Sequence, residues 1–152
     1  MTEKTLAIIK PDAIANQLTG SVISMIEKNG FNIEVMFKAN LPEEMYEEFY
    51  AEHQGKPFFK NMVDIMASGP VVIMILDKEN AVADFRKLIG ATNPADAAEG
   101  TIRKLYGKSI DHNVIHGSDS VASAEREIEI LFGGISEEDL ECDFEEEDET
   151  GD

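Results

Sequence analysis

The sequence predicts an α/β sandwich, in which helices pack on a partly antiparallel β-sheet. Two short apolar runs, residues 5–9 and 71–76, have the continuous hydrophobic character of buried strands. A third run, residues 31–39, alternates apolar and mostly polar side chains, as a half-buried strand does. The segments between these runs place apolar residues at helical spacing. We expect the helices to pack largely on one face of the sheet.

Four helices are predicted between and after these strands. Residues 22–30 carry apolar side chains at helical spacing and end in a glycine, which is a frequent helix stop. Residues 42–52 begin with a proline and are rich in acids, which favours a helix because a proline at its start loses no hydrogen bond. Residues 58–67 show one apolar face. Asn80 is a candidate cap for a helix that runs to about residue 89.

The last third of the chain predicts a loop, a strand and a helix. Residues 91–112 contain an Asn-Pro pair and two glycines, so we expect them to be irregular. Residues 114–115 are a short apolar pair that predicts the final strand. The last helix begins at Ser120 or Ser123, both suitable caps, and ends at about residue 132.

The net charge of −18 is concentrated at the C-terminal end. Residues 133–152 hold eleven Asp and Glu and no Lys or Arg, whereas residues 1–132 hold the other twenty acids and all thirteen bases. Like charges with few apolar residues do not offset the entropy of ordering a chain. We therefore expect a folded domain over 1–132 and an acidic, disordered tail over 133–152. No basic stripe stands out, so strong nucleic-acid binding is not expected.

Membrane association and secretion are not predicted either. The longest apolar run, residues 71–76, is too short to cross a bilayer, and the run at 6–9 is shorter than a signal peptide requires. The single cysteine, Cys142, cannot form an intramolecular disulfide, which agrees with a reducing compartment. We expect a soluble, cytoplasmic protein.

Among the three histidines, His116 has the context of a reactive residue. It follows the apolar pair 114–115 and precedes a glycine, which allows close backbone approach. The alternative is an ordinary histidine at a strand end, and the context alone favours neither. Glu127 flanks the apolar stripe of the last helix, where its carboxylate would hold one imidazole nitrogen and leave the other as a nucleophile. The alternative for Glu127 is a solvated helix glutamate, and the residues alone favour this alternative. No histidine pair or cysteine cluster has metal-ligand spacing, so no structural metal site is predicted.

Several scattered side chains are candidates for binding a phosphorylated ligand. Lys10 follows the first strand, and Arg86 and Arg103 lie on either side of the irregular segment, as cations gathered around a phosphate would. Phe58 offers a ring that could stack on a nucleobase. Taken one at a time, scattered Lys and Arg residues are usually surface residues, and the adjacent pair Phe58-Phe59 is more often one buried and one half-exposed ring. Composition and spacing alone lead to an α/β domain with a candidate reactive histidine.

A longer motif surrounds this histidine. Residues 113–119 read Asn-Val-Ile-His-Gly-Ser-Asp, which resembles the N-x-x-H-G-S-D active-site signature of nucleoside diphosphate kinases. The blocks Lys-Pro-Asp at 10–12, Gly-Lys-Pro-Phe-Phe at 55–59 and Gly-Thr-Ile-Arg at 100–103 are similar to this family and occur in its order. The resemblance covers residues 3–132 without a large gap.

The resemblance implies a fold and a reaction. The fold is a ferredoxin-like β-α-β-β-α-β sandwich with an antiparallel four-stranded sheet and extra helices. The reaction is ping-pong: a nucleoside triphosphate phosphorylates His116, and a nucleoside diphosphate then takes the phosphate. This exchange maintains nucleoside triphosphate pools. Mg²⁺ is implied as a cofactor that is held mainly by the nucleotide phosphates rather than by a protein site.

The resemblance also implies residue roles. Glu127 orients the imidazole of His116, and Ser118 forms a hydrogen bond near it. Phe58 stacks on the base, which explains low base selectivity because every base has a π-face. The remaining implied residues hold the sugar and phosphates: Lys10, Tyr50, Arg86, Thr92, Arg103 and Asn113. Lys10 and Asn113 are expected close to the sugar hydroxyls.

The resemblance implies a homo-oligomer, a tetramer or hexamer built on a shared dimer. The chain departs from the family pattern at Asn16, at Lys104-Leu105 and at Asp111-His112, in regions that help to build subunit contacts. Two other functions fit parts of the sequence. An interaction protein would display the acidic tail to basic partners, and a phosphohistidine enzyme would pass its phosphate to proteins rather than to nucleotides.

Overall fold

Four antiparallel strands form one sheet in the computed structural model, which describes residues 2–133. The strands are β1 (Glu3–Ile9), β2 (Asn32–Ala39), β3 (Val71–Lys78) and β4 (Ile115–Gly117), and their order in the sheet is β2-β3-β1-β4. β1 lies between β3 and β4 and is antiparallel to both. The antiparallel four-stranded sheet and the ferredoxin-like order of elements are confirmed.

Seven α-helices and two short 3₁₀ helices complete the described part of the chain. The helices are α1 (Pro11–Ala15), α2 (Thr19–Lys28), α3 (Glu43–Phe49), α4 (Phe59–Ala67), α5 (Ala81–Ile89), α6 (Ile102–Tyr106) and α7 (Val121–Phe132). The 3₁₀ helices are η1 (Ala51–His53) and η2 (Pro94–Asp96).

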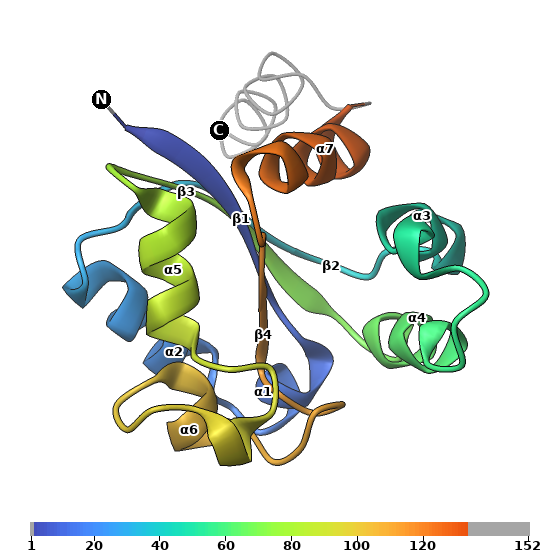
Figure 1. Ribbon diagram of the computed structural model, residues 1–152, viewed down its shortest axis with the longest axis horizontal. Coiled ribbons are helices and arrows are strands. Elements are labelled where there is room, and N and C mark those ends of the chain that lie inside the picture. The colour runs from blue at the N-terminus through green and yellow to red at the C-terminus, as the bar shows by residue number, and fades with distance from the viewer. Residues whose placement is uncertain (1, 134–152) are drawn as a thin grey trace, which may run out of the picture.

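Helices cover both faces of the sheet, so the expectation of helices largely on one face is wrong. Figure 1 shows α2, α5 and α6 on one side of the sheet and α3, α4 and α7 on the other. Successive residues of a strand point to opposite faces. Ala7 and Ile9 of β1 therefore pack toward α2 and α5, whereas Leu6 and Ile8 pack toward α3, α4 and α7. Burial on both sides explains why β1 and β3 are continuously apolar.

The segment expected to be irregular, residues 91–112, contains both η2 and α6, so this prediction is wrong in part. Thr101 caps α6, because its hydroxyl accepts a hydrogen bond from the Lys104 amide at 3.3 Å. Arg103 lies within α6 and is anchored by hydrogen bonds to residues elsewhere in the chain. Such tertiary contacts stabilise helices that are too short to form alone.

The structure confirms one of the two predicted helix caps and not the other. Ser120 caps α7 by accepting the Ser123 amide at 3.0 Å, so the first of the two candidate serines is confirmed. Asn80 does precede α5, but its side chain forms no cap. The carboxylate of Glu3 accepts the Val82 amide instead, at 3.0 Å. A residue 79 positions away thus supplies the cap.

Within residues 2–133, no helix combines the length and the apolar character that crossing a bilayer requires. The expected acidic tail falls almost entirely at 134–152, outside the described residues.

Candidate active site

A cleft of about 520 Å³ opens beside β4 and gathers side chains from distant parts of the chain. Its walls come from the end of β1, from the segment around η1, from α5, from the loop before β4 and from α7. Nine of the ten residues proposed from the sequence line this cleft: Lys10, Tyr50, Phe58, Arg86, Thr92, Arg103, Asn113, His116 and Glu127. The tenth, Ser118, is fully buried behind Glu127.

His116 stands at the centre of this arrangement. It lies on β4 opposite Ile8, so the sheet fixes its backbone. Its Nε2 atom lies 3.0 Å from Oε1 of Glu127. Because a carboxylate only accepts hydrogen bonds, Nε2 is the donor in this contact, and in the neutral imidazole the lone pair then lies on Nδ1. Within the described residues no hydrogen bond engages Nδ1, which leaves this nitrogen available to a ligand.

Glu127 is itself held in place. Its side chain is buried, with 5% of the residue exposed, so the alternative of a solvated helix glutamate does not apply. Ser118 Oγ donates to the same carboxylate oxygen at 2.7 Å, and the Leu6 amide donates to Ser118 Oγ at 3.3 Å. A chain of hydrogen bonds therefore links β1 to the imidazole through Ser118 and Glu127. Ser118 contacts the carboxylate rather than the ring.

Two aromatic side chains fix the other sides of the imidazole. Phe49 packs edge-on against the His116 ring, with ring centres 5.0 Å apart, and Tyr50 lies 6.4 Å away. Burial, followed by the charge of Glu127, raises the pKa of Tyr50 far above its ordinary value. The phenol stays protonated and can donate a hydrogen bond into the cleft. Phe49 was not identified from the sequence, because nothing local marks it as a neighbour of His116.

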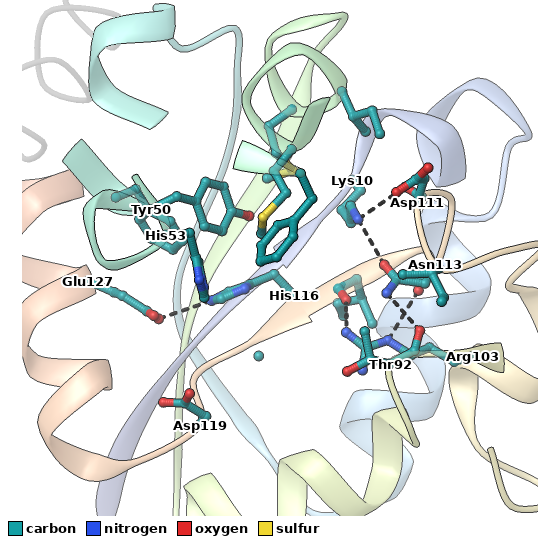
Figure 2. Close-up of a pocket in the computed structure, with 18 of the residues that line it drawn as sticks. Lys10, Tyr50, His53, Thr92, Arg103, Asp111, Asn113, His116, Asp119 and Glu127 are labelled. Carbon is teal, nitrogen blue, oxygen red and sulfur yellow. Dashed lines mark hydrogen bonds and ion pairs between the residues drawn. The ribbon is translucent and has the colours of Figure 1, made fainter. Parts of the chain in front are cut away.

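Lys10 and Asn113 form a polar pair on the opposite side of His116 from Glu127, as Figure 2 shows. Lys10 Nζ donates to Oδ1 of Asn113 at 2.8 Å, and Nδ2 of Asn113 donates to the Thr92 carbonyl at 3.0 Å. Burial is the main cause that lowers the pKa of Lys10, and the charge of Asp12 opposes it. The structure brings Lys10, Thr92 and Asn113 together in one cleft.

Arg103 is buried and binds backbone carbonyls on three sides. Its guanidinium donates to the carbonyls of Gly90 at 2.9 Å, Ile115 at 2.7 Å and Asn113 at 3.4 Å. Burial, with a further contribution from the charge of Arg86, lowers the pKa of Arg103 to about 10. Arg103 thus keeps its charge near neutral pH. It also braces the loop after α5 against β4.

Gly117 follows His116 because α5 lies too close for any side chain. A Cβ atom built at Gly117 would lie 2.9 Å from the Phe85 ring and 3.0 Å from Ile89 Cδ1. Both residues belong to α5, which also carries Arg86. The prediction that the glycine after His116 allows close approach is confirmed: the side chains of α5 pack against the backbone of Gly117.

Two further cleft residues were not assigned a role from the sequence. Asp119 lines the cleft, and a hydrogen bond from Ser123 is the main cause that lowers its pKa, so its carboxylate is ionised. Ile110 also lines the cleft and is 55% exposed, as Phe58 is at 46%. Asp119 is the last residue of the signature motif, so the motif could have identified it as a site residue. Ile110 lies in residues 91–112, which the sequence predicted to be irregular, and no sequence feature marked it as a cleft residue.

Proteins that are similar in sequence to this chain share one family description. A family model described as "Nucleoside diphosphate kinase" matches residues 3–136. Curated proteins with the same description from Chlorobium luteolum and Chlorobaculum tepidum are each 55% identical to this chain over 130 residues. The aligned part covers 86% of this chain and 93% of each relative.

Solved structures agree with the sequence comparison. The nucleoside diphosphate kinase of Aquifex aeolicus has a TM-score of 0.84 at 37% identity, covering 87% of this chain and 96% of that chain. A halophilic nucleoside diphosphate kinase from Halobacterium salinarum, solved in complex with CDP, has a TM-score of 0.84 at 40% identity. That match covers 87% of this chain and 88% of the other.

Proposed function

The chain belongs to the nucleoside diphosphate kinase family, and from that premise we propose that His116 carries the phosphate between the two nucleotides. The family transfers the terminal phosphate of a nucleoside triphosphate to a nucleoside diphosphate through a phosphohistidine, in a ping-pong reaction. The observation that supports His116 most strongly is its hydrogen bond to Glu127, which engages Nε2 and leaves Nδ1 to the cleft.

In the first half-reaction, the lone pair of Nδ1 attacks the terminal phosphorus. The N–P bond forms as the bond from phosphorus to the bridging oxygen breaks, and the electron pair leaves with the diphosphate. The ring gains positive charge in this step, and the Glu127 carboxylate offsets that charge through Nε2–H. In the second half-reaction, a terminal oxygen of another diphosphate attacks phosphorus, and the N–P bond breaks.

The cationic and polar side chains of the cleft support nucleotide binding. Arg86, Thr92 and Arg103 surround the approach to His116 and would hold the phosphates. Lys10 and Asn113, which already bind one another, would contact the sugar hydroxyls and the phosphates. The protonated phenol of Tyr50 would donate a further hydrogen bond. The CDP complex of the Halobacterium salinarum relative supports a diphosphate as the ligand of this cleft.

Base binding would use the exposed apolar residues of the cleft, Phe58 and Ile110. A ring and an aliphatic side chain can pack on the faces of any base, because every base has a π-face. The polar groups near the Phe58 ring are the His53 ring, 5.4 Å away, and Lys56 Nζ, 5.8 Å away, and stacking itself does not distinguish one base from another. We expect low selectivity among bases.

The side chains fit a magnesium-bound nucleotide better than a metal site built from protein alone. Residues 2–133 contain no group of three or more carboxylate, histidine or cysteine side chains that could hold a metal. Asp119 places one ionised carboxylate in the cleft, and oxygen is the ligand that Mg²⁺ prefers. Asp119 would therefore contact the ion while the phosphates supply its other ligands. When bound, Mg²⁺ supplies positive charge to the phosphates.

Assembly into a homo-oligomer is part of the proposal, and β2 provides a reason for it. β2 is an edge strand, and its apolar side chains are only half-buried, with Met36 51% exposed. Edge strands with unpaired backbone groups readily pair with another chain. A dimer of this kind would be the unit of a tetramer or hexamer. We place the protein in the cytoplasm, in keeping with its single cysteine.

Isolating the two half-reactions tests this proposal. ATP labelled in its terminal phosphate, added with Mg²⁺, is expected to leave one acid-labile, alkali-stable phosphate on each chain. Adding an unlabelled diphosphate of a different base should transfer that label to the new triphosphate. Exchange between nucleotides without a labelled protein would contradict the phosphohistidine step in this chain.

A further inference from the structure

The backbone makes a strained turn two residues before His116. Val114 has a φ of 77°, and the Ile115 amide donates to the Asn113 carbonyl at 2.9 Å. A hydrogen bond between residues two apart, around a central residue with this φ, defines the rarer and strained form of γ-turn. A β-branched side chain at positive φ is a marked outlier. Such strain persists only where surrounding contacts enforce it.

This γ-turn separates two residues of the site. Asn113 precedes the turn and binds Lys10, whereas His116 follows it on β4. Both side chains line the same cleft, although an extended strand would place residues three apart on opposite faces. The turn is therefore the local feature that sets the position of Asn113 relative to His116.

Both peptide groups of Val114 are held by residues at the start of α1: Lys10, which precedes the helix, and Asp12 in its first turn. The Lys10 amide donates to the Val114 carbonyl at 2.8 Å. The Val114 amide donates to Oδ2 of Asp12 at 3.2 Å, across 102 residues of sequence. The side chain of Val114 is fully buried, so no solvent can replace these partners.

The simpler role for Asp12 is that of an acidic residue in the first turn of a helix, where it favours the helix dipole. The structure argues against this as its main role. α1 has five residues, its cap forms no side-chain hydrogen bond, and the Asp12 carboxylate bonds to Val114 outside α1. We propose that Asp12 is a positioning residue: its carboxylate holds the γ-turn at Val114 and so fixes Asn113 and Lys10 relative to His116. This inference rests on the proposed function of His116.

The experiment compares kcat and KM for phosphate exchange in the wild type and four variants. These are Asp12→Ala, Asp12→Asn, Val114→Gly and the double variant Asp12→Ala/Val114→Gly. Asp12→Ala is expected to lower kcat about tenfold to a hundredfold, because small displacements of reacting groups are costly, with a smaller change in KM. Asp12→Asn keeps an oxygen that accepts the Val114 amide and is expected to stay within about threefold of wild type.

The double variant separates a positioning role from a structural one. Glycine adopts positive φ without strain, so the turn should form without its Asp12 partner. The double variant is expected to regain at least about threefold in kcat over Asp12→Ala, although loss of the buried Val114 side chain lowers its thermal stability further. Activity and stability would then move in opposite directions, which a merely structural role does not produce.

Glu3→Ala is the matched control. Glu3 also accepts a backbone amide, that of Val82 at 3.0 Å, but it does so at the start of α5 and lies outside the cleft. This variant is expected to lower the melting temperature while kcat stays within about twofold.

Three results would overturn the inference. They are an Asp12→Ala variant within twofold of wild type, an Asp12→Asn variant as impaired as Asp12→Ala, and a double variant no more active than Asp12→Ala. The second result would mean that Asp12 acts through its charge on Lys10. If Asp12→Ala does not fold, a double variant tenfold or more below Asp12→Asn overturns the inference as well. Failure of the wild type to exchange phosphate would refute the proposed function instead.

Discussion

At the inner end of the cleft Glu127 and Ser118 are almost wholly buried, whereas at the outer end Phe58 and Ile110 leave about half of their surface exposed. The inner end is bound together by hydrogen bonds that run from β1 to His116. The outer end presents the Phe58 ring and the Ile110 side chain to the cleft, and the side chains of His53 and Lys56 pack against the ring. This difference matches what each end would contact. The transferred phosphate is the same in every reaction, but the base differs from one nucleotide to the next.

The contrast predicts different kinetic effects at the two ends. Changes at the inner end should lower kcat, because they disturb groups that act on the reacting atoms. Changes at the outer end should raise KM and leave kcat at saturating nucleotide nearly intact. The following predictions test this division, from the largest expected effect to the smallest.

His116→Ala is expected to abolish both phosphate exchange and labelling of the protein by ATP, because the attacking nitrogen is removed, while nucleotide still binds. Labelling with ATP and binding of a diphosphate measure the two parts separately. His112→Ala is the control: His112 is an exposed loop histidine four residues away, and activity should stay within about twofold. Stable labelling of the His116→Ala protein would refute the assignment.

Glu127→Ala should slow exchange roughly tenfold to a thousandfold without abolishing it, as expected for a group that orients the nucleophile and offsets its charge. The change should appear in kcat and in the rate of labelling by ATP. Glu125→Ala is the matched control and should have little effect, because Glu125 is an exposed acid on α7, whereas Glu127 is buried. Activity of Glu127→Ala within twofold of wild type would show that the buried hydrogen bond to His116 is not needed.

Phe58→Ala should raise KM about fivefold to a hundredfold, since stacking on a base contributes about 1–3 kcal/mol. The kcat at saturating nucleotide should change little, and purine and pyrimidine nucleotides should both be affected. Leu105→Ala provides the control, because Leu105 is an exposed apolar residue that does not line the cleft. A fall in kcat with unchanged KM would mean that the two ends are not functionally distinct.

Deletion of residues 137–152 should have the smallest effect. The deleted segment lies beyond the family match at 3–136, and charge effects are screened over about 8 Å at physiological salt. Exchange activity is therefore expected to stay within about threefold at physiological salt, with any difference growing as salt is lowered. Activity of the truncated protein across a salt series is the measurement. Loss of activity at physiological salt would mean that the domain extends into the acidic segment.

The parts of the fold that were predictable from sequence depend on local patterns. β1 and β3 are visible as apolar runs, β2 as an alternating run and α7 as a periodic stripe that follows a serine cap. The division of β1 side chains between two helical layers was not visible, because a continuously apolar run does not reveal which helices cover each face. The Glu3 cap on α5 joins residues 79 apart, and no local signal marks such a pair.

The same limit applies to the site. His116 and Glu127 were accessible from sequence because a motif and a helix face both pointed to them. The bracing of the loop by Arg103, the edge-on packing of Phe49 and the bond from Val114 to Asp12 depend on how separate elements meet. The γ-turn is the clearest case. Valine has no preference for positive φ, so its sequence predicted a strand residue where the structure has a turn.

The close contact at Gly117 has a consequence for engineering this scaffold. Phe85 and Ile89 occupy the space that a side chain at Gly117 would need, and their helix also carries Arg86. Even a methyl group added there would force Phe85 and Ile89 to shift, and any movement of α5 that follows would displace Arg86, which lines the cleft. A library that varies residues around His116 to accept new phosphate donors should therefore keep Gly117 unchanged. If a larger residue is wanted at that position, Phe85 and Ile89 must be made smaller in the same design.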